Sequence, residues 1–292
     1  MFSGIGMIIT RGIQGIKGAD PEYFAIALAT YYVSVFLFSV RWKYILRGVG
    51  MEVPLGELFQ ANLAGLFMNN VTPMSRGGGE FLRMLWVSKR SNVPMGISAV
   101  TVLYERILES VPVMFMTAIG ILYFTSTQAL LGLILGITVV FIWVKWERFI
   151  EITLRIFRVK VSEGDRERIL ALRNAHSVNL IGIAMSSAVW ILDVARLKLI
   201  TLAFGLHISL IVIVFISVVN LILGIAAFTP GGIGVVEGGL VGAFTYVGLS
   251  PTIAVSVVVL ERFISYVLGS VPGIIVLLTS GGREVWRALR SR

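Results

Sequence analysis

The sequence contains no cysteine and only two histidines, His176 and His207, among its 292 residues. The absence of cysteine excludes disulfides, thiolate metal sites and cysteine nucleophiles, and the shortage of histidine argues against a histidine-rich metal centre. Charged residues are also scarce, at 14% of the chain. No nucleotide-binding motif is found, so we expect no cofactor, and any transport would draw on an ion gradient or on the gradient of the transported lipid.

Apolar residues dominate instead. They make up 57% of the chain, and the mean hydropathy is +0.90. Uncharged runs occupy residues 110–144, 199–236, 238–260 and 263–282, and each reaches the roughly 20 residues that one bilayer-spanning helix requires. The sequence therefore predicts an all-α polytopic membrane protein with about 7–8 membrane segments.

The basic residues give a formal net charge of +9 and gather at the ends of the apolar segments. This distribution is typical of cytoplasmic loops that face anionic headgroups, and it gives no support to nucleic-acid binding. We expect a multi-pass protein of the plasma membrane, with the hydrophilic connection 147–178 cytoplasmic and a basic tail at 281–292. The tryptophans near predicted helix ends are expected to form an interfacial aromatic belt: Trp42, Trp86, Trp143, Trp146 and Trp286.

The chain repeats itself. "TPMSRGGGE" at 72–80 and "TPGGIGVVE" at 229–237 both read Thr-Pro, six residues, Glu. Downstream, "ER" at 105–106 matches "ER" at 261–262 with an offset of 156, and each is followed by Ser-Val-Pro, where the offset slips to 160. Upstream, Arg41 matches Arg196 with an offset of 155. We infer one repeat at about 22–124, a connecting span and amphipathic segment at about 128–178, and a second repeat at about 179–280.

Each repeat contains a Gly-rich break followed by a short re-entrant-like helix. Matched interrupted segments in two repeats are the sequence pattern of a transport site at the repeat interface. The direction of the repeats stays open. The basic segments before and after the second repeat both look cytoplasmic, which requires an even number of crossings between them. Only three spans are clear there, so either the short helix after the second break also crosses or one basic end departs from the positive-inside rule.

The Gly-rich breaks have two interpretations. A glycine loop that leads into a helix N-terminus presents free N–H groups to an anion, and a lipid phosphate is the obvious anion here. The alternative is structural: Thr72 and Thr229 cap helices, proline follows, and glycines permit close helix packing.

The charges inside apolar segments form a second constellation. Glu105 and Arg106 point about 100° apart on a helix, so each should find its partner elsewhere, and Glu80 and Glu237 are the candidates. Either these groups are structural salt bridges, or Arg106 and Arg262 hold a headgroup phosphate while carboxylates hold a cation or relay protons. Arg76 and Arg83 either contribute at the cavity mouth or are plain positive-inside charges, and Asp193 is expected to pair with Arg196. The predicted substrate-binding residues are Thr72, Arg76, Gly78, Glu80, Glu105, Arg106, Thr229, Gly232, Glu237, Glu261 and Arg262.

"NNVTPMSRGGGEFLR" and "TPGGIGVVEGGLV" together resemble the flippase-like transmembrane family named for lysylphosphatidylglycerol synthase, which includes the membrane domain of the multiple peptide resistance factor. The resemblance covers most of the chain. It implies a polytopic domain that moves a lipid with a polar headgroup between leaflets, with both Gly-rich loops near the lipid path. Two features depart from it: the chain shows no synthase domain, and Val236 stands where many relatives carry arginine.

The leading hypothesis is a non-enzymatic lipid flippase or scramblase for an anionic or polyprenyl-phosphate-linked lipid. Its expected partners are membrane lipids with an anionic headgroup, no nucleic acid, and a homo-oligomer is left open. The first alternative is a membrane enzyme acting on a lipid phosphate, with Glu80 or Glu237 as general base. The second is a small-solute or ion transporter that uses the same repeat interface.

Overall fold

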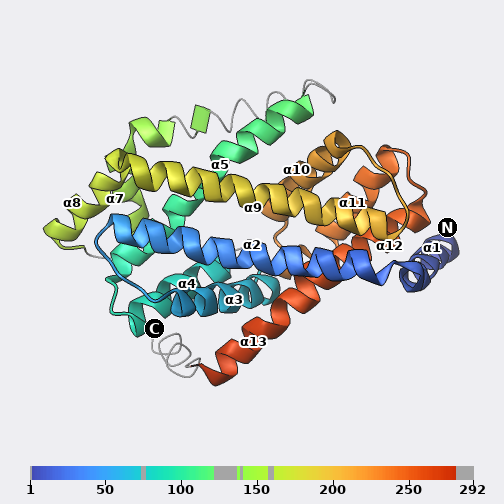
Figure 1. The fold of residues 1–292 in the computed structure, drawn as a ribbon, viewed down its shortest axis with the longest axis horizontal. Coiled ribbons are helices and arrows are strands. Elements are labelled where there is room, and N and C mark those ends of the chain that lie inside the picture. Colours follow the sequence, from blue (N-terminus) through green and yellow to red (C-terminus); the bar gives the residue numbers. More distant parts are fainter. Residues whose placement is uncertain (1, 74–76, 122–136, 139–140, 157–160, 281–292) are drawn as a thin grey trace.

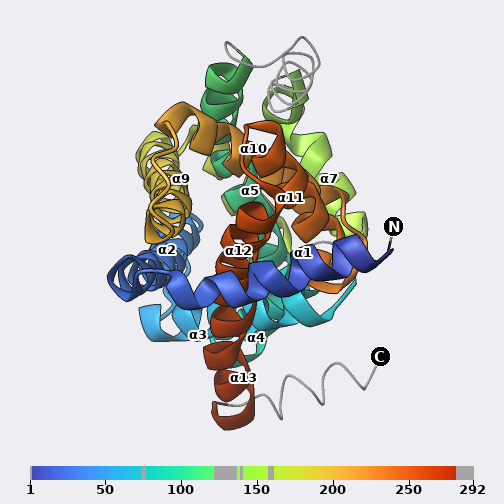
Figure 2. The same ribbon diagram turned by 90° about the vertical axis from the view of Figure 1, so that its right-hand side faces the viewer.

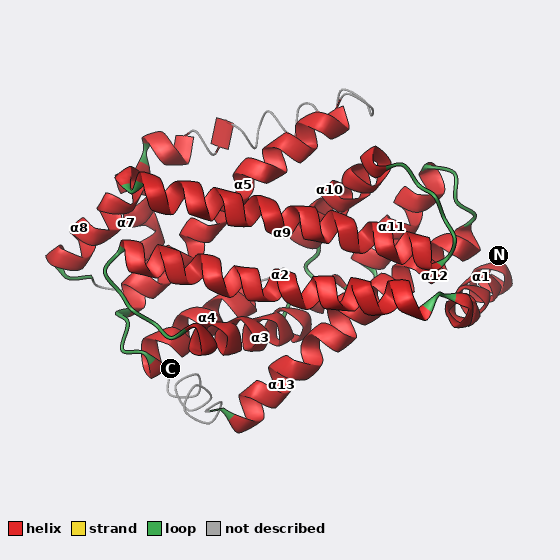
Figure 3. Ribbon diagram, in the orientation of Figure 1, coloured by secondary structure: helices red, strands yellow, loops and turns green. Residues whose placement is uncertain are grey.

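A computed structural model describes residues 2–73, 77–121, 137–138, 141–156 and 161–280. Every regular element in these ranges is helical (Figure 3), as the predicted all-α fold class requires. The helices are α1 (Phe2–Gly15), α2 (Pro21–Gly48), α3 (Leu55–Val71), α4 (Gly77–Arg90), α5 (Met95–Ile121), α7 (Trp146–Ile156), α8 (Glu163–Ala171), α9 (His176–Ala203), α10 (Leu210–Ala226), α11 (Val235–Tyr246), α12 (Pro251–Arg262) and α13 (Gly269–Thr279). A π-helical turn, Phe263–Leu268, joins α12 to α13.

Within the described ranges, three helices are long and apolar enough to cross a membrane: α2 and α9, with 28 residues each, and the continuous rod Pro251–Thr279, with 29. At 1.5 Å per residue, 28 residues extend over about 42 Å, which exceeds the roughly 30 Å hydrocarbon core of a bilayer. The chain is therefore a multi-pass membrane protein, as its composition predicts. The sequence placed a further span at about 128–146, and most of it lies outside the described residues, as does the basic tail 281–292.

The helices α2 and α9 lie side by side and antiparallel along the bundle (Figure 1). The amide of Asp20, which caps the start of α2, donates to the carbonyl oxygen of Ala203 at the end of α9 over 2.8 Å. At the other end, Val178 of α9 packs against Gly48 of α2. Since these two helices occupy matching places in the sequence repeat, the repeated segments run in opposite directions. This is the inverted arrangement, which the charge pattern left open.

Each repeated segment contains a helical hairpin. In the first, Arg90 at the end of α4 bonds through Nε to Glu57 Oε2 at the start of α3 over 2.8 Å, so this hairpin enters and leaves at one end of the bundle. In the second, Gly239 of α11 packs against Leu223 of α10. The matching arms α3 and α10 both have 17 residues. The uncharged run 199–236, long enough for a crossing helix, thus contains one arm of a hairpin in α10, because the chain turns back after Thr229.

This hairpin resolves the conflict in the crossing count. The helices α9 and α12–α13 traverse the bundle in opposite directions, and the α10–α11 hairpin returns to the end it started from (Figure 1). The carbonyl of Ser280 accepts a hydrogen bond from Arg90, which places the end of α13 beside the end of α4. The hydrophilic helices α7 and α8 lie at this same end of the molecule.

Two apolar cores occupy opposite halves of the molecule. One joins the last turns of α2 with α3, α4, the first half of α5, α7 and α8, and the other joins α9 with α10, α11 and α12. The helix α1 lies across the second end, against α12 (Figure 2), where Ser256 Oγ donates to Gly12 O over 2.8 Å. Polar side chains gather between the two cores, and they form the site described next.

The prediction of an interfacial tryptophan belt is wrong for three residues. Trp42 and Trp86 are fully buried and Trp146 is 2% exposed, all within the first core. The indole of Trp42 donates to Thr101 Oγ1 over 3.1 Å, so its polar atom is satisfied inside the protein. A buried tryptophan with an internal hydrogen-bond acceptor does not need the membrane interface.

Candidate functional site

The tips of the two hairpins meet in the middle of the molecule. Asn70, at the end of α3, donates through Nδ2 to Ser270 Oγ over 2.8 Å, and its carbonyl oxygen accepts from Tyr266 Oη over 2.9 Å. Gly231, at the tip of the second hairpin, lies against both the Tyr266 ring and the Asn70 carbonyl. Tyr266 belongs to the π-helical turn, so the two breaks and the π-turn form one junction. π-Turns inside helices frequently mark functional sites.

A fully buried ion pair lies on each side of this junction. Arg41 of α2 reaches Glu105 of α5, with Nη2–Oε1 at 3.2 Å, and Arg196 of α9 reaches Glu261 of α12, with Nη1–Oε1 at 2.9 Å. Their side chains are at most 8% exposed. Matching positions of the repeat make the same contact, so the inner ion pairs (Arg41–Glu105 and Arg196–Glu261) are a duplicated feature.

The inner pairs also connect the two repeats to each other. Arg41 donates to Ser186 Oγ of α9 over 3.0 Å, and the Arg196 guanidinium lies 5.6 Å from the centroid of the Tyr31 ring of α2. Ser186 and Tyr31 are themselves matched by the offset of 155 between α2 and α9. The contact of Arg41 with α9 and the contact of Arg196 with α2 are therefore equivalent under the repeat. Breaking a buried pair costs about 3–5 kcal/mol where one charge is left without any partner.

A second, more accessible pair is duplicated as well. Arg106 bonds to Glu80 of α4, and Arg262 Nε bonds to Glu237 Oε1 of α11 over 2.7 Å. In these outer ion pairs the arginine side chains are 34% and 16% exposed. The sequence-based prediction that each Glu-Arg dipeptide finds its partner at Glu80 or Glu237 is confirmed for both arginines.

The two halves differ at one important position. Arg83 of α4 bonds to Glu105 and, through Nη1, to Glu80 Oε2 over 2.8 Å, whereas the matching position of α11 is Leu240. Arg83 is 5% exposed and lies inside the cluster, so it contributes to the site and is not a plain positive-inside charge. The reason is electrostatic: two carboxylates stabilise a buried guanidinium that a helix end would have left in water.

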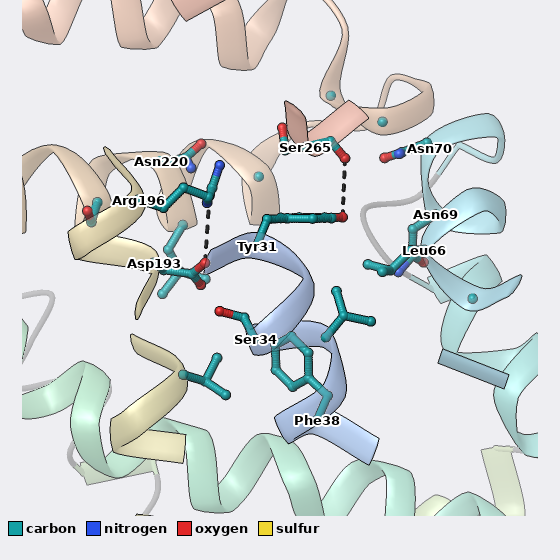
Figure 4. A pocket seen from close by; sticks show the side chains of 18 of the residues that line it. Tyr31, Ser34, Phe38, Leu66, Asn69, Asn70, Asp193, Arg196, Asn220 and Ser265 are labelled. Atoms are coloured by element: carbon teal, nitrogen blue, oxygen red, sulfur yellow. Dashed lines mark hydrogen bonds and ion pairs between the residues drawn. The ribbon is translucent and has the colours of Figure 1, made fainter. Parts of the chain in front are cut away.

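A cavity of about 260 Å³ lies beside these ion pairs, between the two repeats, and several of the paired side chains line it. Figure 4 shows Asn69 and Asn70 on one side, Asp193 and Arg196 on the other, and Tyr31 between them. Four arginines and four carboxylates line it, so its charges balance: Arg83, Arg106, Arg196 and Arg262 with Glu80, Glu109, Asp193 and Glu261. Amides and hydroxyls supply hydrogen-bonding groups between these charges. The arrangement suits a small, polar, charged group better than an apolar ligand.

The glycine loops are held by internal contacts. Gly231, Gly232 and Gly234 have φ values of 58°, 74° and 85°, which only glycine adopts without strain. Glu237 Oε2 accepts from the Gly234 amide over 2.6 Å and so occupies the start of α11. The Gly231 carbonyl oxygen accepts from Arg262 Nη2 over 2.6 Å. The second loop is therefore capped by Glu237 and not by Thr229, whose side chain makes no capping hydrogen bond, so the predicted threonine cap is wrong here.

The first loop is packed in a related way. The side chain of Thr72 covers Gly78 so closely that a Cβ there would collide with it. The amide of Gly79 donates to Asn69 Oδ1 over 2.8 Å. Thr72 Oγ1 bonds to its own helix at Met68 O over 2.7 Å. These contacts keep the tip of the first hairpin compact beside the cavity.

The structure brings most of the predicted site residues together. Those that line the cavity are Glu80, Arg106, Gly232, Glu261 and Arg262. Glu105 lies behind them and is fully buried, and Glu237 contacts the cavity through Arg262. Thr72, Gly78 and Thr229 shape the hairpin turns, where Thr229 Oγ1 bonds to Ile233 O over 2.9 Å. Arg76 lies outside the described residues.

Sequence reasoning missed the importance of Arg41 and Arg196. Arg41 was expected as a charge at the end of a span, and Arg196 as the partner of Asp193. The Asp193–Arg196 contact exists at 3.7 Å, but Glu261 is the closer partner of Arg196 at 2.9 Å. The signal that identifies both arginines is their match in the repeat, with an offset of 155.

The fold and the site define the class: a polytopic α-helical membrane protein in which two inverted repeats enclose a cavity lined by duplicated ion pairs. The chain belongs to the family described as the lysylphosphatidylglycerol synthase TM region, which it matches over residues 9–273. This match confirms the resemblance carried by the two Gly-rich motifs, and it supports a membrane-lipid-related role in general.

The chain is also similar to archaeal proteins named UPF0104 membrane proteins. One from Methanothermobacter thermautotrophicus is 30% identical, over 89% of this chain and 86% of the relative. One from Methanocaldococcus jannaschii is 27% identical, over 91% and 87%. One from Pyrococcus horikoshii is 27% identical, over 92% and 90%. Their names specify a membrane protein and no substrate.

Proposed function

We propose that this protein moves a lipid with an anionic headgroup, such as a phospholipid or a polyprenyl-phosphate-linked lipid, between the leaflets of the membrane. The observation that carries the proposal is the ion-paired cavity where the two hairpin tips meet. The headgroup passes through this cavity while the apolar tails stay in the bilayer. The protein thus acts as a transporter and not as an enzyme.

The energetics favour a functional role for the cavity charges. A charged side chain at the centre of a membrane helix costs about 2.5–3.5 kcal/mol on insertion scales, and such residues typically mark substrate or ion pathways. This chain places eight of them around one cavity. Its volume, about 260 Å³, is close to the lower end of ligand pockets, roughly 300 Å³, so it fits a headgroup and not a whole lipid.

The outer ion pairs supply the binding step. Arg106 and Arg262 are the arginines with the more exposed side chains, at 34% and 16%, and each holds a carboxylate of the adjacent hairpin. Two oxygens of a tetrahedral phosphate can accept from both arms of a guanidinium, as the two oxygens of a carboxylate do. The headgroup phosphate therefore exchanges with Glu80 or Glu237, and the released carboxylate frees the hairpin tip to move.

The orientation follows from the basic end of the bundle. The hydrophilic helices α7 and α8, together with Lys89 and Arg90, lie at the end where α2 finishes and α9 begins. We propose that this end, with the 147–178 connection, faces the cytoplasm at the plasma membrane, and its basic residues support this through the positive-inside rule. With this orientation, each hairpin is a re-entrant element, one from either face of the membrane.

Leaflet exchange in liposomes tests the proposal. The purified protein is reconstituted with fluorescent phospholipids of anionic or zwitterionic headgroup, and a membrane-impermeant quencher reports the fraction reachable from outside. We expect exchange of anionic lipid above that of empty vesicles. Loss of one guanidinium–phosphate contact removes about 1.5–3 kcal/mol of stabilisation, so Arg262→Ala should slow exchange about ten- to a hundredfold.

Arg47→Ala is the matched control. Arg47 also pairs with a carboxylate, Glu52, at 3.0 Å, but its side chain is 46% exposed at the end of α2. This variant should exchange lipid at the wild-type rate. Wild-type exchange equal to that of empty vesicles for every anionic lipid tested would overturn the proposal. Thin-layer analysis of the same vesicles distinguishes lipid movement from chemical turnover, and new lipid products would point to an enzyme.

A further inference from the structure

The inner carboxylates of the two repeats, Glu105 and Glu261, differ in how many of their oxygens accept a hydrogen bond. Both oxygens of Glu105 have cationic partners, since Oε1 accepts from Arg41 and Oε2 accepts from Arg83. Glu261 accepts from Arg196 through Oε1 only, and its Oε2 has no hydrogen-bond partner although the side chain is 3% exposed. The difference arises because Leu240 stands where Arg83 stands in the first repeat.

The charge count around Glu261 agrees with this difference. In the first repeat, three arginines face three carboxylates: Arg41, Arg83 and Arg106 with Glu80, Glu105 and Glu109. In the second, two arginines face three: Arg196 and Arg262 with Asp193, Glu237 and Glu261. Arg196 is shared between two of these carboxylates. The second cluster therefore carries one more negative charge than positive charge.

The surroundings of Glu261 can be followed element by element. From α2 it faces Tyr31, from α9 Asp193 and Arg196, and its neighbour Arg262 holds Glu237 of α11. Lys198 of α9 is engaged elsewhere, with Ile208 O at 2.5 Å. Across the cavity lie the charged side chains of α4 and α5, which are Glu80, Arg83, Arg106 and Glu109. The helices packed against the start of α12 carry two further cations, Arg11 and Lys17. Neither of them lines the cavity that Glu261 faces.

The ligand that fits this position is a proton. A metal ion would need several oxygen ligands, and the described residues contain no group of three Asp, Glu, His or Cys side chains able to hold one. The Arg196 guanidinium, 2.9 Å from Glu261 Oε1, would also repel a metal cation. A proton needs only one unpartnered oxygen, and Glu261 Oε2 supplies it. The hydroxyl of Ser265, one turn further along and lining the same cavity, also has no hydrogen-bond partner, so it is available to accept a hydrogen bond from the protonated carboxyl.

We propose that Glu261 is a proton-binding site and that its protonation is coupled to passage of the headgroup. The proton comes from water and forms an O–H bond on Oε2, which turns the carboxylate into a neutral carboxylic acid. An anionic headgroup that engages Arg196 or Arg262 withdraws positive charge from Glu261, so headgroup binding favours proton uptake and headgroup departure favours release. The coupling rests on the proposed lipid transport, whereas proton binding by Glu261 does not.

Infrared spectroscopy of the protein in lipid nanodiscs tests the proton site without any transport assay. On acidification we expect a carbonyl-stretch band of a protonated carboxyl that shifts in deuterated water and is lost in Glu261→Gln. The matched substitution in the other repeat, Glu105→Gln, should leave this band in place because both oxygens of Glu105 already accept hydrogen bonds from arginines. A pH-dependent band that is unchanged in Glu261→Gln would overturn the proposal.

Leu240→Arg provides a second variant that keeps the carboxylate. It restores in the second repeat the arginine that Arg83 supplies in the first, so the band of Glu261 should vanish although Glu261 is still present. Circular dichroism and a single size-exclusion peak establish that each variant is folded. Persistence of the band in folded Leu240→Arg would show that the missing arginine is not what opens Oε2 to a proton, and it would count against the site.

The coupling is tested in the liposomes used for lipid exchange, with a pH gradient of one unit across the membrane. One proton per lipid allows the gradient to shift the leaflet ratio of the labelled lipid by up to about tenfold in the wild type. Glu261→Gln should abolish the shift. Exchange that ignores the gradient in the wild type would refute the coupling while leaving lipid transport standing. A proton band on Glu261 with no lipid exchange would refute the transport function while leaving the proton site standing.

Discussion

The matched carboxylates Glu105 and Glu261 offer a direct comparison of the two repeats, through the same glutamine substitution. Glu105→Gln removes the charge that holds Arg41 and Arg83, both buried, and should cost about 3–5 kcal/mol of stability. Glu261→Gln leaves Arg196 with Asp193 and brings the second cluster to two arginines and two carboxylates. Its cost should stay below about 1.5 kcal/mol, the range of one ordinary hydrogen bond.

Thermal unfolding in detergent, followed by tryptophan fluorescence, measures the difference. Trp42 lies 4.4 Å below the Arg83 guanidinium, and Trp190 lines the cavity, so both clusters have a nearby reporter. At about 2–4 °C per kcal/mol, Glu105→Gln should lower the midpoint by about 6–20 °C, and Glu261→Gln by less than about 6 °C. Equal midpoints for the two variants would refute the reasoning, because they would show that the number of arginine partners does not decide the stability of these carboxylates.

Three further outcomes follow from the junction of the hairpin tips. Gly231→Ala places a Cβ against Tyr266 at a φ of 58° and should lower the unfolding midpoint by the equivalent of about 1–3 kcal/mol, whereas Gly56→Ala, in open space on α3, should raise it slightly. Tyr266→Phe removes the hydrogen bond to Asn70 O and should cost about 0.5–1.5 kcal/mol in the same measurement; no change would mean that this contact does not hold the tips together. Arg262→Lys keeps the charge but loses the planar fork whose Nε and Nη2 bond Glu237 and Gly231 separately, so lipid exchange should fall more than tenfold, and a wild-type rate would show that charge alone suffices.

The repeat pattern allowed the sequence to predict the outer ion pairs. Arg106 and Arg262 lie within spans too apolar to tolerate an isolated charge, so each required a carboxylate, and the duplicated motifs supplied Glu80 and Glu237. The helical class followed equally well, since long uncharged runs have few alternatives in a membrane.

Other features depend on contacts between distant residues. The inner partner of Arg41 is Glu105, 64 positions away, and nothing in the local sequence separates a buried arginine from one at a helix end. Hydropathy alone also fails to separate a crossing helix from one arm of a hairpin, because α10 is apolar along its 17 residues in either case. The amides of Asn69 and Asn70 carry no charge, and only their position at a hairpin tip connects them with the cavity.

Inverted repeats relate two orientations of a transporter by exchanging the shapes of its halves. If the halves were identical, the cavity would face either side of the membrane with equal free energy, and the resting protein would have no preferred direction. Arg83 and Leu240 break this equivalence, since they occupy one position of the repeat with and without a charge. Under the proposed transport function, this buried position contributes a bias between the two orientations, and exchanging the two side chains should reverse that contribution.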